Sequence, residues 1–277
     1  MTDERFRTIG ATTYLCPTPT VLVGCAEQDG WKTGTGGANL VTVAWTGICC
    51  TKPPVLSISL RPERHSHGLI LRSGEFTVNL VGEALLYAMD FCGVKSGREV
   101  DKFAALGLTA MRAEGLNTAP ALMEAPAYLS CRVRQVLALG SHDLFLADIV
   151  EVCVNERYIR ADGSLDETAM RLIAHVHGKY RVMGAEAGFF GFSVAGEKAL
   201  RRRAPYLYPD GRPEADTSAG AGDAPRRKPA GGSAAGGLAG KPRRKAAQNA
   251  ANHETDRKPR PGPAGKPLSG GKRGGKP

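Results

Sequence analysis

One short segment of the sequence joins two arginines to a helix start, a combination suited to binding an anion. The segment is Ser59–His67 (SLRPERHSH), and it follows a strand-like run. The pattern predicts a helix that begins at or near Ser66, whose hydroxyl would cap the first turn. The amides of that turn lack carbonyl partners and carry partial positive charge, and Arg61 and Arg64 lie beside them. The segment therefore favours a phosphate site, against the alternative of a surface turn with two solvated arginines.

A second helix start carries basic residues between glycines. It lies in Cys92–Phe103 (CGVKSGREVDKF), where Ser96 and Glu99 have the spacing of a capping box. Three cations surround this start, namely Lys95, Arg98 and Lys102. Two basic helix starts in one small domain strengthen the hypothesis of an anion site. The alternative is a helix whose charges only face water.

A glycine-rich loop precedes the strand-like run Asn39–Trp45 (NLVTVAW). The loop, Thr33–Ala38 (TGTGGA), does not fit a dinucleotide fingerprint, because Asn39 stands where the third glycine belongs and a strand follows in place of a helix. A loop that leads into a strand can still bring backbone N–H and C=O groups against a flat polar ring. On the local pattern alone, a plain hairpin loop is favoured.

Histidine and cysteine spacing gives no metal-site signature. The seven cysteines contain no C-x-x-C pair, and the His-x-His pairs at 65–67 and 175–177 lack a third ligand at a recognisable spacing. We therefore expect no metal, and we expect buried, reduced thiols. His142 differs, because it lies at the turn between two apolar runs, where it serves either the turn or the mouth of a site.

The elements that must position these residues are mostly strands. Short β-branched or alternating runs, and a hairpin across 140–143, predict strands over Pro19–Cys25, Asn39–Trp45, Val55–Leu60, Glu75–Val81, Tyr128–Leu139 and Leu144–Val154. Short helices are expected over Ser66–Ser73, Glu83–Phe91 and Glu99–Leu106. Antiparallel strands with few helices favour a β-barrel or a sandwich.

Charge and composition divide the chain near residue 200. Residues 201–277 hold 18 Lys and Arg against 6 Asp and Glu, whereas residues 1–200 hold 19 against 21. The C-terminal part also has no Val, Ile, Met, Phe, Trp or Cys, so it cannot bury enough apolar surface to fold. We predict a folded domain at 1–200 and a disordered tail at 201–277, rich in Gly, Pro, Ala, Lys and Arg.

The sequence also bears on location and on binding to polyanions. No apolar run approaches 18 residues, and the first ten residues lack the apolar stretch of a secretory signal, so we expect a cytoplasmic protein that does not span a membrane. Basic clusters at 226–228 and 241–245 raise the alternative of polyanion or nucleic-acid binding by counterion release. A solvated tail that only aids solubility is the favoured interpretation.

Taken in order, these motifs resemble the flavin reductase-like family, and within it the flavoredoxin branch. The resemblance covers about residues 10–195 and rests on NLVTVAW at 39–45, PP at 53–54, SLRPERHS at 59–66, LI at 69–70, GEFTVNL at 74–80, CGVKSGREVDKF at 92–103 and GSHDLFLADIV at 140–150. One departure is Ala147, because relatives often carry glycine before the acidic residue there. The fold implied is mainly β, an FMN-binding split β-barrel with a few short helices.

The resemblance implies a homodimer with FMN in a groove near the subunit interface, and it assigns candidate roles to residues. The strand over Asn39, Leu40, Val41, Thr42, Val43 and Ala44 would lie against the isoalloxazine ring. The phosphate and ribityl chain would be held by Arg61, Arg64, His65 and Ser66, with Ser96, Arg98 and Lys102 at the phosphate end. His142 matches a histidine beside the nicotinamide or flavin in reductases of the family, and it is the catalytic candidate.

The activity that the resemblance implies is that of an oxidoreductase moving a hydride from NADH or NADPH to flavin N5. Electrons then pass to an acceptor, which can be a protein. One alternative is a flavoredoxin-type FMN electron carrier that a protein partner reduces, with little NAD(P)H activity. The other, of a different class, is polyanion or nucleic-acid binding through the basic tail. The first two share the FMN groove, so the sequence does not separate them.

Overall fold

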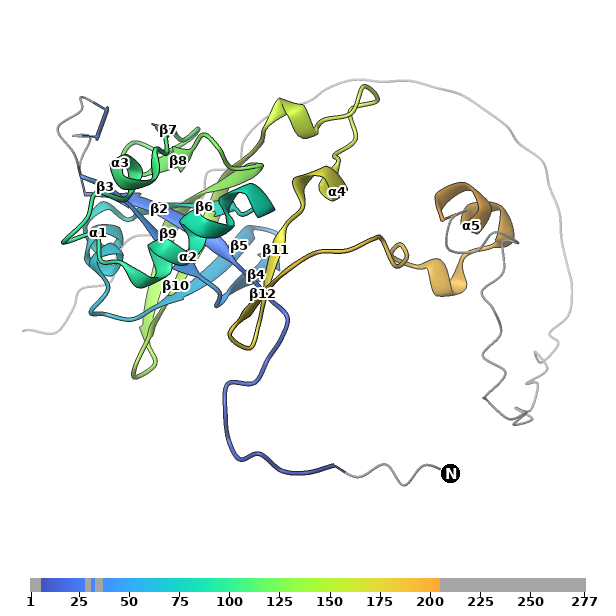
Figure 1. The fold of residues 1–277 in the computed structure, drawn as a ribbon, viewed down its shortest axis with the longest axis horizontal. Helices are drawn as coiled ribbons and strands as arrows, with labels where there is room; N and C mark the ends of the chain where they lie inside the picture. Colours follow the sequence, from blue (N-terminus) through green and yellow to red (C-terminus); the bar gives the residue numbers. More distant parts are fainter. Residues whose placement is uncertain (1–5, 28–30, 33–36, 205–277) are drawn as a thin grey trace, which may run out of the picture. The chain divides into compact units, whose positions relative to one another are not determined.

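The computed structural model describes residues 6–27, 31–32 and 37–204, and its largest sheet has seven strands; Figure 1 shows how these strands are arranged. All neighbouring strands are antiparallel, in the order β3-β2-β6-β9-β10-β5-β4. The strands are β2 (Val21–Ala26), β3 (Ala38–Val43), β4 (Thr46–Thr51), β5 (Pro54–Leu60), β6 (Glu75–Leu80), β9 (Ala127–Ala138) and β10 (Asp143–Val154).

Two small sheets and several short helices complete the described part of the fold. One sheet has the order β1-β11-β12 and the other pairs β7 with β8, formed by β1 (Thr18–Pro19), β7 (Ala110–Arg112), β8 (Pro120–Leu122), β11 (Ile173–Val176) and β12 (Lys179–Val182). The α-helices are α1 (His65–Ser73), α2 (Leu86–Val94), α3 (Lys102–Leu106), α4 (Glu167–Met170) and α5 (Glu197–Arg203). Single helical turns are η2 (Glu83–Leu85), η3 (Glu156–Tyr158) and η4 (Phe192–Val194).

Strand β3 contributes to two apolar cores, because successive side chains of a strand point to opposite faces. Val41 and Val43 belong to an inner core that also holds the fully buried Phe76 and Phe145. Leu40 packs on the other face, against side chains of α2 and α3. The inner core joins side chains from both ends of the sheet, and β3 approaches β5. The sheet is therefore curled into a barrel rather than flat.

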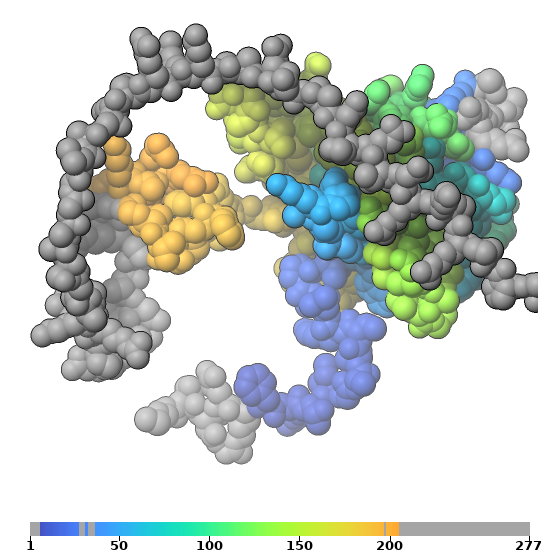
Figure 2. Space-filling model, turned by 180° about the vertical axis from the view of Figure 1, so that it is seen from behind, coloured from blue at the N-terminus to red at the C-terminus, as the bar shows by residue number. Residues whose placement is uncertain are grey.

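The predicted mainly β fold is confirmed, and most predicted strands are found within a few residues of their expected bounds. The long hairpin of β9 and β10 is close to its prediction. β4 is not among the predicted strands, because its sequence, TGICCT, has no alternation, and five of its six residues are exposed. Figure 2 shows this region, in light blue, at the surface. A bulge at Cys49 shifts its register against β5.

Several predictions concern parts that the structure does not describe. Residues 33–36 of the glycine loop and residues 205–277 of the predicted tail lie outside the described residues. The tail's disorder, its binding to polyanions and the domain boundary near residue 200 therefore stay predictions, as does the homodimer. Among the helices of the described residues, none combines the length and apolar character needed to cross a bilayer.

Candidate functional site

Two hollows lie side by side where β3, α1 and the α2–α3 connection meet. The first, here called the basic hollow, has a volume of about 320 Å³ and is lined by Asn39, Val41, Arg61, Glu63, Arg64, His65, Ser66, Lys95, Ser96, Gly97 and Lys102. The second hollow, of about 160 Å³, is lined by Val41, Thr42, Val43, Ala44, Trp45, Ser59, Leu60, Arg61, Arg64 and His142. Three residues, Val41, Arg61 and Arg64, line both, so the hollows are adjacent.

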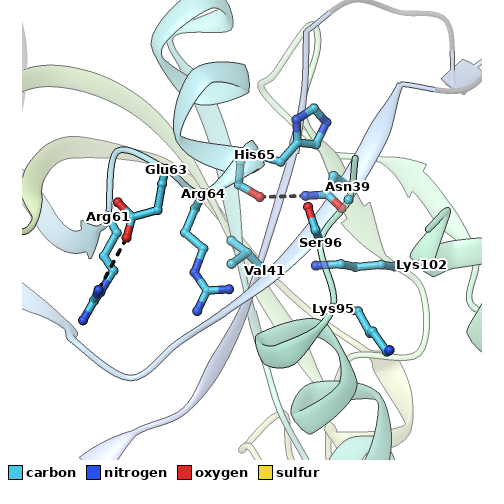
Figure 3. A pocket seen from close by; sticks show the side chains of 11 residues that line it. Asn39, Val41, Arg61, Glu63, Arg64, His65, Lys95, Ser96 and Lys102 are labelled. Atoms are coloured by element: carbon cyan, nitrogen blue, oxygen red, sulfur yellow. Dashed lines mark hydrogen bonds and ion pairs between the residues drawn. The ribbon is translucent and has the colours of Figure 1, made fainter. Parts of the chain in front are cut away.

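Positive charge dominates the basic hollow, which Figure 3 shows from close by. Four cationic side chains line it, and Glu63 is the only carboxylate among the described lining residues. Glu63 lies 3.4 Å from the Arg61 guanidinium. The pKa of Glu63 is lowered, first by a backbone hydrogen bond and then by Arg61. The pKa of His65 is also lowered, first by burial and then by the charge of Arg98. His65 is therefore a neutral member of the lining at neutral pH.

Helix α1 begins one residue before its predicted start, and Ser66 does not cap it. Arg64 occupies the N-cap position with extended backbone and no side-chain cap bond. Ser66 lies inside the first turn, buried, and its Oγ accepts a 2.8 Å hydrogen bond from Nδ2 of Asn39. The first helical amides therefore have no side-chain acceptor from a cap, and this positively polarised helix start borders the basic hollow through His65 and Ser66. The predicted helix end at Gly74 is confirmed by its φ of 69°.

The predicted capping box of Ser96 and Glu99 is wrong. Helix α3 begins at Lys102, and Asp101 caps it by accepting a 3.1 Å bond from the amide of Ala104. Ser96 instead accepts a 3.2 Å bond from the amide of Arg98 in a tight turn. A carboxylate one residue before the helix competes successfully with the earlier hydroxyl. A Cβ on Gly97 would stand 2.3 Å from Oδ1 of Asn39, so this turn can approach β3 only with glycine.

Lys102 is a buried cation at the wall of the basic hollow. Its side chain is 2% exposed, and Nζ donates to the carbonyl oxygens of Leu40 at 2.6 Å and Cys92 at 2.9 Å. Figure 3 shows its amino group directed toward the middle of the lining residues. Burial lowers the pKa of Lys102. Within the described part of the chain it forms no ion pair with a carboxylate, so its charge is solvated by carbonyl dipoles alone.

The second hollow joins the end of β3 to the tip of the β9–β10 hairpin. The imidazole of His142 stands 4.7 Å from the indole of Trp45, centroid to centroid, with the rings tilted by 40°. Nδ1 of His142 lies 2.9 Å from Oγ of Ser141. Thr42 is fixed by a hydrogen bond from its hydroxyl to the carbonyl of Met89 in α2. The hollow thus has one flat aromatic side and one side of strand backbone.

Most of the residues singled out from the sequence line one of these two hollows. Two do not: Leu40 points into the core behind β3, and Arg98 donates to the carbonyl of Glu63 at 2.9 Å outside the lining. Residues that the sequence reasoning did not assign to the site also line it, chiefly Lys95 and Trp45. Lys95 lies in the basic segment 92–103 (CGVKSGREVDKF), and the positive charge of that segment was the sequence feature that could have placed Lys95 in the site.

The cysteines differ in exposure: three are buried, two are half-buried and two are exposed. All seven are unbonded, and burial raises the pKa of Cys25 to about 12 and of Cys92 to about 11, so these thiols are protonated at neutral pH. The prediction of buried thiols is wrong for Cys49 and Cys50, which are exposed on β4. In the described ranges, no three His, Cys, Asp or Glu side chains gather as metal ligands would.

Comparison with known proteins explains this arrangement. Residues 13–182 match the family described as flavin reductase like domain. The chain belongs to the flavin reductase-like family. The structure of flavoredoxin from Desulfovibrio vulgaris (Miyazaki F) superposes with a TM-score of 0.62 at 29% identity, over 69% of this chain and all of that one. The curled sheet is thus the split barrel of this family, and the resemblance to its flavoredoxin branch is confirmed.

Two curated relatives with named activities are similar to parts of this chain. The reductase component of 4-nitrophenol 4-monooxygenase/4-nitrocatechol 2-monooxygenase from Rhodococcus opacus is 32% identical over 129 residues, 42% of this chain and 64% of that protein. FMN reductase (NADH) RutF from Pseudomonas syringae pv. syringae is 26% identical over 109 residues, 39% of this chain and 58% of that protein. The family and these relatives support a flavin-related oxidoreductase function.

Proposed function

We propose that this chain binds FMN across the two hollows and works as an NADH- or NADPH-dependent flavin oxidoreductase. The observation that carries the proposal is Lys102, a buried cation whose hydrogen-bond partners in the described part of the chain are carbonyl oxygens, at the wall of a hollow lined by three further cations. Burying a charge without a counter-charge is costly. A phosphate dianion in the basic hollow would supply that counter-charge, and riboflavin, which has no phosphate, would not.

The residues present fit the phosphate end of FMN. Arg61 and Arg64 offer planar donors that suit phosphate oxygens, and the start of α1 adds backbone amides with partial positive charge. Lys95 and Lys102 bring charge from the opposite wall, which the α2–α3 connection forms. Ser96 contributes a hydroxyl, whereas the hydroxyl of Ser66 already accepts from Asn39 and acts by fixing the helix.

The second hollow fits a flat ring with a polar edge. Among the described residues, β3 is an end strand of the sheet and pairs only with β2, so the backbone groups on its other side have no strand partner there. Such groups can hydrogen-bond the heteroatoms of an isoalloxazine ring. Thr42, Val43 and Ala44 bring this backbone to the hollow. Because Val41, Arg61 and Arg64 line both hollows, one ligand can place its phosphate in one and its ring in the other.

The chemistry of the reaction is a hydride transfer, for which bound FMN supplies the acceptor. The residues of this chain would bind the phosphate and orient the ring. Hydride transfer requires no side-chain acid. We therefore assign His142, at the mouth of the second hollow beside Trp45, to positioning the nicotinamide of the donor. The relative named FMN reductase (NADH) supports this reading of the donor.

A second candidate function is an FMN electron carrier that a protein partner reduces. The similarity to the flavoredoxin structure favours it, because that chain is covered over its whole length. Both functions need the same FMN site, and they differ in whether nicotinamide nucleotides reduce it. A monooxygenase would be a suitable acceptor for the reduced flavin, as the name of the Rhodococcus opacus relative suggests.

The proposal is tested in two steps with the full chain. Flavin-stripped protein is titrated with FMN and, separately, with riboflavin, and flavin fluorescence is followed. Saturation near one FMN per chain with weaker binding of riboflavin supports the site, and no FMN binding by folded protein overturns it. The oxidation of NADH and of NADPH is then measured with FMN present. Turnover supports the reductase, whereas bound FMN without turnover supports the electron carrier.

A further inference from the structure

A partly buried hydrogen bond connects α1 to the start of β10, outside the lining of either hollow. Nε2 of His67 lies 2.8 Å from Oδ2 of Asp143, and the two side chains are 8% and 18% exposed. The imidazole donates to the carboxylate, which has no proton of its own to give when ionised. The ring of His67 also meets that of Phe145 edge-on, 5.2 Å away at 79°. The pair is therefore held in one geometry by packing as well as by the hydrogen bond.

The sequence neighbours of this pair are the residues that we place at the two ends of the flavin site. His67 follows Ser66 in the first turn of α1, beside the basic hollow. Asp143 follows His142 and is the first residue of β10, where it pairs with Leu60 at the end of β5 and with Ala138 at the end of β9. Two consecutive residues of α1 thus bind two different strands: Ser66 binds β3 through Asn39, and His67 binds β10.

The side chain of His142 at the hairpin tip contacts Trp45 and Ser141, and neither of these contacts reaches α1. Gly140 has a φ of 108°, which favours glycine, and the turn is closed by a hydrogen bond from the amide of Leu139 to the carbonyl of His142. Ser141 is exposed. The hydrogen bond between His67 and Asp143 connects the end of this turn to the start of α1. It adds to the pairing of the turn with its neighbouring strands.

We propose that His67 and Asp143 are positioning residues, which set the distance between the helix start that would hold the phosphate and the imidazole of His142. The inference rests on the proposed function for its catalytic consequence. The claim about the position of His142 does not rest on the proposed function, because that position can be observed through Trp45 without any flavin. Loss of the bond frees the hairpin tip, so His142 leaves Trp45 and no longer stands at the mouth of the second hollow.

The first test uses Trp45 as a reporter. The chain has two tryptophans, so Trp31→Phe leaves Trp45 as the single emitter. A histidine in contact with an indole quenches its emission, so we expect His142→Ala and Asp143→Ala to raise it equally. Asp143→Asn keeps an acceptor oxygen and restores the parent emission. Asp148→Ala is the matched control, because it removes the bond to Arg134 farther along the same hairpin, and it leaves the emission unchanged.

The outcomes of this test separate positioning from simple stabilisation. If Asp143→Ala lowers the melting temperature but keeps the parent emission of Trp45, the pair is structural only and the inference is overturned. If Asp143→Ala does not fold, His67→Phe provides the second variant, because it keeps a ring against Phe145 and removes the donor to Asp143. Emission that changes in His67→Phe while the protein stays folded supports positioning, and unchanged emission overturns it.

The second test adds the flavin and separates this inference from the proposed function. In Asp143→Ala we expect the Kd for FMN to stay within about threefold of the parent and the rate of flavin reduction at saturating nucleotide to fall at least about tenfold. Asp143→Asn recovers most of the rate. A parent protein that binds no FMN overturns the proposed function and leaves the fluorescence result to decide the inference. A parent that is reduced normally, with Asp143→Ala equally fast, overturns the inference alone.

Discussion

The side-chain amide of Asn39 donates a 2.8 Å hydrogen bond to Oγ of Ser66, and this bond joins the edge strand β3 to the first turn of α1. Both side chains are buried, at 4% and 1% exposure. The strand that would contact the flavin ring and the helix start that would contact its phosphate are thereby fixed to each other. A change at either residue is expected to act on stability and on binding together.

Replacing Ser66 by alanine leaves the buried amide of Asn39 without this acceptor. We expect the free energy of unfolding to fall by about 1–3 kcal/mol, the cost of an unsatisfied buried donor, as measured by urea denaturation. The double variant Asn39→Ala/Ser66→Ala should lose less than the sum of the two single variants, because the bond can be lost only once. Strict additivity would show that the two residues act independently.

Arg61 is exposed and is expected to act on binding alone. Arg61→Ala should weaken FMN binding by about 1.5–3 kcal/mol, the range for a hydrogen bond to a charged group, which is an increase in Kd of about 10- to 150-fold. Fluorescence titration of the flavin-stripped variant measures it. Arg181→Ala, another exposed arginine, on β12, is the control for a general loss of positive charge. An unchanged Kd in Arg61→Ala would remove the residue from the site.

Lys102 makes FMN binding depend on pH in a way that riboflavin binding does not. Because burial lowers its pKa, the lysine loses its charge in the folded protein at a pH where the unfolded chain still keeps it. Raising the pH through the lowered pKa should therefore weaken FMN binding, while riboflavin, which has the same ring, serves as the reference. Lys102→Met should abolish the difference between the two pH profiles, as titrations from pH 7 to pH 10 would reveal.

The lowered pKa of Lys102 also predicts how the stability of the flavin-free protein depends on pH. Whereas FMN binding should weaken as the pH rises, the contribution of Lys102 to stability should increase. Between the lowered pKa of folded Lys102 and the value of 10.5 that lysine has without burial, the unfolded state binds more protons. The contribution of Lys102 to the free energy of unfolding therefore rises with pH across that window. Thermal melts of the parent and of Lys102→Met at several pH values would expose the difference. A difference in melting temperature between the parent and Lys102→Met that stays constant with pH would contradict the lowered pKa of Lys102.

His142 should affect reduction and leave cofactor binding intact. His142→Ala keeps the basic hollow, so we expect the Kd for FMN to be unchanged and the rate of flavin reduction by NADH or NADPH to fall about 10- to 100-fold through poorer positioning. Stopped-flow absorbance of the flavin measures the rate, and titration measures the Kd. Loss of FMN binding in this variant would mean that His142 holds the cofactor instead.

Local sequence patterns predicted the elements that depend on their own residues. The β9–β10 hairpin was predictable because two long apolar runs flank a short turn, and the end of α1 because Gly74 can adopt a positive φ. β4 was not, since it is held by pairing with β5 rather than by an alternating pattern. Both predicted serine caps failed, because tertiary contacts and a better carboxylate acceptor took their places.

The site shows the same division between local and long-range information. The basic helix starts were visible as segments, but their meeting in one hollow depends on the curl of the sheet. The burial of Lys102 could not be read from a sequence in which it resembles any surface lysine. The pairing of His67 with Asp143 joins residues 76 positions apart, and no spacing rule connects them.

The buried free cysteines can be used to measure how often the core of this chain opens transiently. A thiol as buried as that of Cys25 or Cys92 can react with an alkylating reagent only while the surrounding structure is transiently open, whereas Cys49 and Cys50 react at once. The thiol of Cys25 donates to the carbonyl of Asn39 at 3.7 Å, directly behind the basic hollow. The rate at which Cys25 is alkylated therefore measures how often the edge of the barrel opens at this point. A ligand bound in the basic hollow would lower that rate.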